Sequence, residues 1–289
     1  MTRSAAVALM VAAPVLWSSA GVVTRHIERA APFEQVFWRS FFAFAFVFAI
    51  LVWKKDNPWK SVRAAGVPGL VSGLMWALMF TAFLFALSLT TTANTLVVMA
   101  VSPLLTALFA WLFLKDPLPA RTWIAAGAAA LGIAWMFGSQ LDNHLLGMAV
   151  ASLIPAAAAI NVVTLRASAA SLDLVPAVML GGALSCVIAL PFALPFSATP
   201  RDVLLLAFLG FFQLALPCML LVIASRTLLA PEIALLGLLE VVLGPLWVWL
   251  AVGEEPARAT LIGGSIVLAA LVSNEISATL KPSPGRMPG

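Results

Sequence analysis

The chain has 289 residues, of which 63% are hydrophobic and only 10% are charged, and its mean hydropathy is +1.07. A soluble domain has about 45–50% apolar and about 25% charged residues. The composition of this chain therefore excludes a soluble domain and indicates an integral membrane protein. The formal net charge of +4 requires no nucleic-acid partner, because most of the excess falls on short connections where membrane proteins carry positive charge.

Apolar stretches follow one another along the chain, each of about 20 residues, the length of an α-helix that crosses a hydrocarbon core of about 30 Å. Short polar connections, many with proline or glycine, separate them as turns between antiparallel helices would. We therefore predict an all-α integral membrane protein with ten transmembrane helices. The predicted spans are residues 4–24, 33–53, 66–88, 93–114, 120–138, 146–165, 172–194, 203–225, 231–252 and 260–278.

The two halves of the chain resemble each other. A shift of 138 residues pairs Ser102 with Glu240 and Thr122 with Thr260, and near the start a shift of 140 residues pairs Val22 with Val162. Each half holds five predicted spans, and because that number is odd, the second half enters the membrane from the opposite side, as in inverted-repeat transporters. The predicted units are a first five-helix repeat at 1–138, a second, inverted five-helix repeat at 139–280 around a shared central cavity, and a disordered tail at 281–289.

Lysine and arginine are unevenly divided between the two sides of the predicted membrane. If the N-terminus lies inside, the outer connections hold only Arg25, Arg29, Arg201 and Arg258. The positive-inside rule therefore predicts that both termini are cytoplasmic. The inner residues are Arg3, Lys54, Lys55, Lys60, Arg63, Lys115, Arg121, Arg166, Arg226, Lys281 and Arg286.

Each half closes with an apolar helix, an acidic turn and a final helix of small residues. The acidic turns are "LKDP" at Leu114–Pro117 and "GEEP" at Gly253–Pro256. In these features nearly the whole chain resembles the drug/metabolite transporter superfamily, EamA type, and within it the aromatic amino acid exporters. The resemblance implies a monomeric basket of ten helices in a bacterial inner membrane, which exports amino acids from the cytoplasm by alternating access.

Two prolines point to a substrate site. Pro14 and Pro155 lie in mid-span, one position apart after the shift of 140 residues that relates the two halves. Interrupted helices at such positions mark the sites of inverted-repeat transporters, and a proline leaves a carbonyl that a ligand can bind. The alternative is a pair of ordinary kinks filled by helix packing.

Methionine and aromatic residues recur at helical spacing in the third predicted span. The series consists of Met75, Trp76, Met79, Phe80 and Phe83, and a methionine and aromatic lining accepts ligands of several shapes. The alternative interpretation is that these residues form a structural stripe that faces lipid or the hydrophobic core. Trp17 is a stronger candidate, because small residues such as Gly21 follow Pro14 and would leave space beside it.

Polar residues are rare within the predicted spans, and those that occur should face the bundle or water. Asn161 and Gln213 are candidates for hydrogen bonds to a zwitterionic ligand, or equally to neighbouring helices. Arg39 lies near the outer end of its span, where it can reach the surface, so a structural role is favoured. Glu240 lies near the predicted midplane, where it could bind a substrate ammonium group, carry a proton, or bond the Val241 carbonyl that Pro245 leaves without a donor.

Sequence motifs for catalysis are missing. His26 and His144 fall in predicted outer loops, and the chain has neither an H-E-x-x-H zinc motif nor a phosphate-binding loop. We therefore expect no enzyme activity, no cofactor and no metal, and the expected partners are a small-molecule substrate and the lipid bilayer. An exporter of other metabolites or drugs, or a lipid-handling or structural membrane protein, is the alternative.

Overall fold

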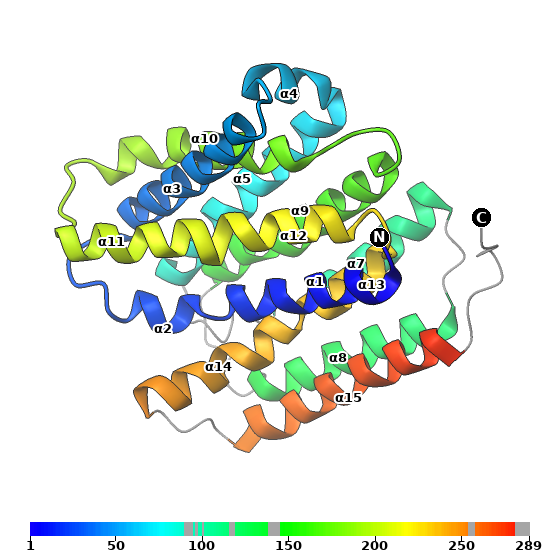
Figure 1. Cartoon of the computed structure of the whole chain (residues 1–289). Coiled ribbons are helices and arrows are strands. Elements are labelled where there is room, and N and C mark those ends of the chain that lie inside the picture. Colours follow the sequence, from blue (N-terminus) through cyan, green and yellow to red (C-terminus); the bar gives the residue numbers. More distant parts are fainter. Residues whose placement is uncertain are drawn as a thin grey trace.

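A computed structural model describes residues 1–89, 95, 98–99, 101–115, 119–137, 145–253 and 258–280. Every regular element in this part of the chain is helical (Figure 1), which confirms the predicted all-α class. The acidic turns at Asp116–Pro117 and Glu254–Pro256, Asn94, His144 and the predicted tail lie outside the described residues.

The helices follow the predicted spans closely. The first half contains α1 (Arg3–Trp17), α2 (Ala20–Thr24), α3 (Pro32–Trp53), α4 (Pro58–Ala64), α5 (Gly66–Leu89), α7 (Ser102–Phe109), the π-helix η1 (Ala110–Leu114) and α8 (Ala120–Phe137). The second half contains α9 (Leu145–Ser168), α10 (Val175–Ala193), α11 (Pro200–Phe208), the π-helix η3 (Leu209–Ala215), α12 (Leu216–Ala224), α13 (Ala230–Gly237), α14 (Leu239–Val252) and α15 (Arg258–Leu280).

Seven helical segments among the described residues are long and apolar enough to cross a membrane. Apolar side chains on these segments are exposed: Val67 is 73% exposed and Leu204 is 71% exposed. Such a surface is stable only in lipid, so this is a multi-pass membrane protein. The other predicted spans contain α7 with η1, α8 and α15, and the total of ten spans remains a prediction.

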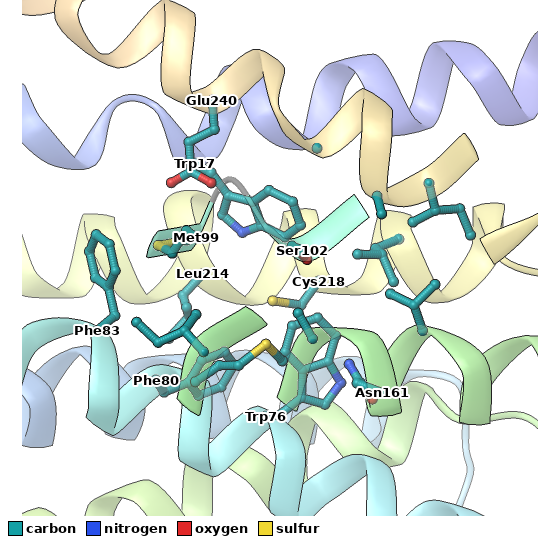
Figure 2. A pocket seen from close by; sticks show the side chains of 18 of the residues that line it. Trp17, Trp76, Phe80, Phe83, Met99, Ser102, Asn161, Leu214, Cys218 and Glu240 are labelled. Atoms are coloured by element: carbon teal, nitrogen blue, oxygen red, sulfur yellow. The ribbon is translucent and has the colours of Figure 1, made fainter. Parts of the chain in front are cut away.

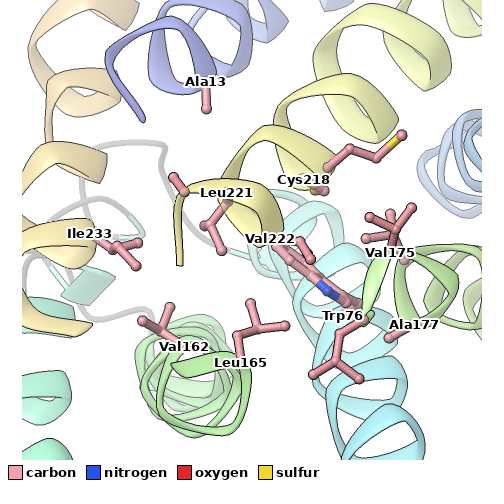
Figure 3. Packing of buried hydrophobic residues seen from close by; sticks show 14 of the residues in the cluster. Ala13, Trp76, Val162, Leu165, Val175, Ala177, Cys218, Leu221, Val222 and Ile233 are labelled. Atoms are coloured by element: carbon pink, nitrogen blue, oxygen red, sulfur yellow. The ribbon is translucent and has the colours of Figure 1, made fainter. Parts of the chain in front are cut away.

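The main hydrophobic core lies where α1, α5, α9, α10, α12 and α13 converge. Trp76 of α5, Val162 of α9 and Leu221 of α12 meet there, each less than 9% exposed (Figure 3). Because lipid tails are as apolar as these side chains, the helices associate through close packing and not through exclusion of water. Glycine makes that approach possible at Gly182 and Gly210, where a Cβ atom would lie 3.0 Å from the Ser40 carbonyl oxygen and 2.6 Å from the Arg39 carbonyl oxygen.

We predict that Gly210→Ala destabilises the protein by about 1–3 kcal/mol, because the added methyl group would overlap the backbone of α3 and force the helices apart. Gly127→Ala is the matched control, since a Cβ atom there meets nothing within 4 Å. Thermal unfolding of both variants in detergent measures the difference. Equal midpoints would show that η3 and α3 do not pack in this way.

Two buried carboxylates tie the connection after α2 to the connection after α10. Glu34 and Asp202 are both 0% exposed. Glu34 accepts hydrogen bonds from the backbone N–H groups of Ser197 and Ala198, both at 2.9 Å. Asp202 accepts from the N–H groups of Glu28 at 2.9 Å and Arg29 at 3.1 Å. These bonds join the two predicted halves at one end of the bundle.

At the other end of the bundle, α1 is bound to α13 by an ion pair. The Arg3 guanidinium lies 3.2 Å from the Glu232 carboxylate. Glu232 also accepts a hydrogen bond from the Leu229 N–H at 3.1 Å, so it caps the first turn of α13. This first-turn carboxylate suits the positive end of the helix dipole, as its position after Pro231 suggests.

Candidate functional site

A cavity of about 180 Å³ lies within the bundle and is lined by both predicted halves (Figure 2). Most of its wall is methionine, aromatic or aliphatic. The polar side chains on the wall come from α3, α7, α9, η3, α12 and α14. They are Arg39, Ser102, Asn161, Gln213, Cys218 and Glu240.

Most of the predicted site residues lie on this wall. They are Trp17, Trp76, Met79, Phe83, Asn161, Gln213 and Glu240. Gly21 and Met75, also predicted, are not lining residues. Gly21 belongs to α2, beyond the break that follows Trp17. Met75 lies one residue before Trp76 on α5 and is partly exposed.

One face of α5 forms the aromatic wall. Trp76, Met79, Phe80 and Phe83 repeat at the spacing of helical turns and all line the cavity. Trp76, Phe80 and Phe83 lie opposite Glu240 in Figure 2. The rings of Trp76 and Phe80 lie 5.6 Å apart between centroids. The Trp76 indole N–H is buried and has no hydrogen-bond partner among the described residues, so it is a free donor at the edge of the cavity.

The first predicted span is divided beside the cavity. The hydroxyls of Ser18 and Ser19 donate to the carbonyls of Val15 at 2.8 Å and Leu16 at 2.7 Å, and such local bonds compete with the helix ladder. The break leaves Trp17 as the last residue of α1, and Trp247 donates to Ser18 Oγ at 2.8 Å.

The two predicted kinks do not behave alike. Helix α1 ends three residues after Pro14, whereas α9 runs through Pro155 without interruption. Neither proline lines the cavity.

Gln213 reaches the cavity from the π-helix η3. A π-helix shifts the side chains that follow onto another face and is frequent at functional sites. The amide nitrogen of Gln213 donates to the Trp17 carbonyl at 3.3 Å, which fixes the side chain next to the break in the first span. Its Oε1 is buried without a partner among the described residues. Asn161 is held differently, since its Oδ1 accepts from Ser72 Oγ at 2.7 Å.

Arg39 is the main site residue that the sequence analysis did not identify. It does not reach the surface: it is 4% exposed and lines the cavity. Its Nη2 donates to the Phe80 carbonyl at 3.0 Å, while Nε has no partner among the described residues. The rarity of an arginine inside an apolar span was the available signal, because such residues usually face the interior of a bundle.

Glu240 stands in the first turn of α14, just after the ninth predicted span is divided at Leu238. Its side chain points into the cavity on the side of Trp17 (Figure 2). The carboxylate forms no hydrogen bond with a described residue, so the bond to the Val241 carbonyl, one of the three alternatives, is not formed. Arg39 lines the same cavity from α3.

The repeat explains the position of another lining residue. Ser102, which the shift of 138 residues pairs with Glu240, begins α7 and lies on the same cavity wall. Sequence analysis quoted Ser102 only as the partner of Glu240. Met10, Met99, Ile154 and Cys218 also line the cavity and were not among the predicted site residues.

We compared the chain with known protein families and solved structures. Residues 4–138 match the EamA-like transporter family. One solved crystal structure is similar over 97% of this chain and 100% of its own, with a TM-score of 0.81 and 19% sequence identity, so it shares the fold. No curated protein matches. The EamA-like match suggests a membrane transporter of small molecules.

The cavity offers both apolar contacts and polar groups without partners. Its apolar wall suits an apolar group, while the free Trp76 N–H, Arg39 Nε and Gln213 Oε1 and the Glu240 carboxylate suit a polar one. Buried polar groups without partners cost free energy, so a ligand that binds them is favoured. Among the described residues no cluster of three His, Cys, Asp or Glu side chains could hold a metal ion.

Proposed function

We propose that this protein is a secondary transporter that exports neutral, largely apolar amino acids, aromatic ones included, from the cytoplasm by alternating access. The observation that carries this proposal is a cavity walled by methionine and aromatic side chains that is also lined by an arginine, Arg39, and a glutamate, Glu240, which form no ion pair with each other. An amino acid with an apolar side chain presents the complementary groups. The expectation from the sequence, that the chain resembles the aromatic amino acid exporters, leads to the same substrate class.

The size of the cavity favours a small substrate. Its volume of about 180 Å³ is below the roughly 300–1,000 Å³ of sites for drug-sized ligands. A cavity of about 150 Å³ is known to hold benzene. A single aromatic or aliphatic amino acid is therefore a better match than a large drug.

The packing of the helices supports two inverted repeats. A shift of five spans relates α3 to α10 and α8 to α15, and each helix packs against its counterpart (Figure 1). The shift also relates α5 to α12 and α9 to α1, and α5 packs on α9 as α12 packs on α1. This pattern is expected around a pseudo-two-fold axis in the membrane plane, where counterpart helices meet. We therefore propose ten spans in two inverted halves, with both termini cytoplasmic in a bacterial inner membrane.

The divided spans support alternating access. The breaks at Ser18–Ser19 and at Leu238 lie beside the cavity, one in each half. Discontinuous helices form the substrate sites of transporters that rock one repeat against the other. The Arg3–Glu232 ion pair joins the two halves at one end, and we propose that it breaks when the cavity opens on that side.

Counterflow in proteoliposomes tests the proposed function. The purified protein should exchange radiolabelled phenylalanine for internal phenylalanine in a saturable manner without ATP, and leucine, methionine and tryptophan should compete while glutamate and lysine should not. Protein-free liposomes are the control. Saturable exchange of a different metabolite, or movement of fluorescent phospholipid between leaflets with no amino acid flux, would replace this proposal by one of its alternatives.

A further inference from the structure

We propose that Arg39 and Glu240 recognise the two charges of an α-amino acid head group, with the Arg39 guanidinium on the carboxylate and the Glu240 carboxylate on the ammonium group. This inference rests on the proposed function and assigns an orientation to the substrate. It makes the complete zwitterion, and not the apolar side chain alone, the feature that the cavity selects.

Arg39 has the properties of an anion site. A guanidinium carries five N–H donors and remains charged, and the hydrogen bond of Arg39 to a described residue uses Nη2 on the neutral Phe80 carbonyl. That bond orients the group but does not neutralise it. The buried Nε stays unpartnered among the described residues, and a guanidinium edge binds a carboxylate with two parallel hydrogen bonds.

Glu240 is the matching cation site. It stands on α14 in the second predicted half, whereas Arg39 stands on α3 in the first half. Both side chains line the cavity, and no ion pair joins them to each other or to another described residue. In a low dielectric, opposite charges that served only to hold helices together would be expected to pair directly. A zwitterion between them compensates both charges.

The polar neighbours of the two charges fit the same head group. Gln213 Oε1 is a free acceptor for an ammonium N–H, and the Trp76 indole is a free donor for a carboxylate oxygen. The aromatic and methionine wall of α5 then receives the side chain. A dicarboxylate or a diamine would leave one of the two charges opposed by a like charge, so such ligands are disfavoured.

A series of analogues tests the orientation on the unmodified protein. Phenylalanine, 2-phenylethylamine, phenylalanine amide and 3-phenylpropionate share the ring and differ in their charges. We expect each of the three analogues to compete with labelled phenylalanine at least about tenfold more weakly than phenylalanine itself, because each loses a charged hydrogen bond. Binding measured by quenching of tryptophan fluorescence gives the same comparison without transport.

Substitutions assign each charge to its partner. In Arg39→Gln the tenfold preference for phenylalanine over 2-phenylethylamine should be lost, while the preference over 3-phenylpropionate should remain. Glu240→Gln should show the opposite pattern, and Arg39→Lys should restore part of the preference for the carboxylate. Arg201→Gln removes a charge from an exposed ion pair with Glu28, in which the Arg201 side chain is 62% exposed, and should leave all preferences unchanged.

The outcomes separate this inference from the proposed function. If the wild-type protein exchanges phenylalanine but 2-phenylethylamine and 3-phenylpropionate compete equally well, the charge assignment is wrong and the proposed function stands. If no amino acid is exchanged or bound, the proposed function itself fails. If Arg39→Gln does not fold, Arg39→Lys and the wild-type series still decide, because neither removes the cation.

Discussion

Replacing Glu34 by alanine is expected to destabilise the protein by about 3–5 kcal/mol, since charged hydrogen bonds contribute about 1.5–3 kcal/mol each and their buried donors would lose their partner. The Glu34 carboxylate is 0% exposed and accepts hydrogen bonds from the Ser197 N–H and hydroxyl and the Ala198 N–H, all at 2.9 Å. Alanine has no acceptor, so the buried N–H groups of Ser197 and Ala198 would lose their hydrogen-bond partner. The connection between α10 and α11 should therefore no longer be held against the start of α3.

The matched control is Glu28→Ala. Glu28 lies at the same end of the bundle and pairs with Arg201 at 2.7 Å, but both side chains are more than half exposed. Exposed ion pairs contribute at most about 1 kcal/mol, so this variant should unfold close to the wild type. Unfolding in detergent, followed by tryptophan fluorescence, measures both. If Glu34→Ala is no less stable than Glu28→Ala, the carboxylate does not hold the connection in the way described.

Replacing Trp17 and Met79 together by alanine is expected to reduce the preference for phenylalanine over valine by about tenfold, equivalent to about 1.4 kcal/mol. Both side chains line the cavity, Trp17 at the end of α1 and Met79 on α5. Their removal takes away contacts with a large substrate side chain, whereas a small side chain loses few. Competition against labelled phenylalanine in proteoliposomes measures the ratio.

Met75→Ala is the control for this change in specificity. Met75 lies on the same helix as Met79 but is not among the lining residues, so the phenylalanine-to-valine ratio should equal that of the wild type. A shift in the ratio with Met75→Ala, together with an unchanged ratio in the double variant, would place the substrate on another face of α5.

The membrane class and the positions of the helices follow from the sequence alone. Predicted spans such as 33–53 and 66–88 correspond to Pro32–Trp53 and Gly66–Leu89. This agreement has a simple cause, since lipid provides no partners for backbone polar groups and an apolar stretch of about 20 residues can cross only as a helix. The breaks within spans were harder to place. Pro14 indicated the first break, but α1 continues to Trp17, where the hydroxyls of the two following serines donate hydrogen bonds to carbonyls of the last helical turn.

The helical period also identified one face of the site. Trp76, Met79 and Phe83 share a face because they are separated by three, four and seven positions, and all three line the cavity. Met75 was placed in the same series, four positions before Met79, but it does not line the cavity. Periodicity therefore predicts which residues of one helix lie together, but not which face is directed at the cavity.

Only the tertiary structure decided which polar residues meet. Arg39, Gln213 and Glu240 come from three helices far apart in the sequence, and a π-helix, which no residue pattern signals, carries Gln213 to the wall. Position within a span suggested that Arg39 reaches the surface, yet the packing of α3 against η3 and α10 buries it beside Phe80. Hydrophobicity and period are local properties that one segment expresses by itself. The direction of a charged side chain, and the charge that faces it across a cavity, depend on neighbours that only the folded bundle brings together.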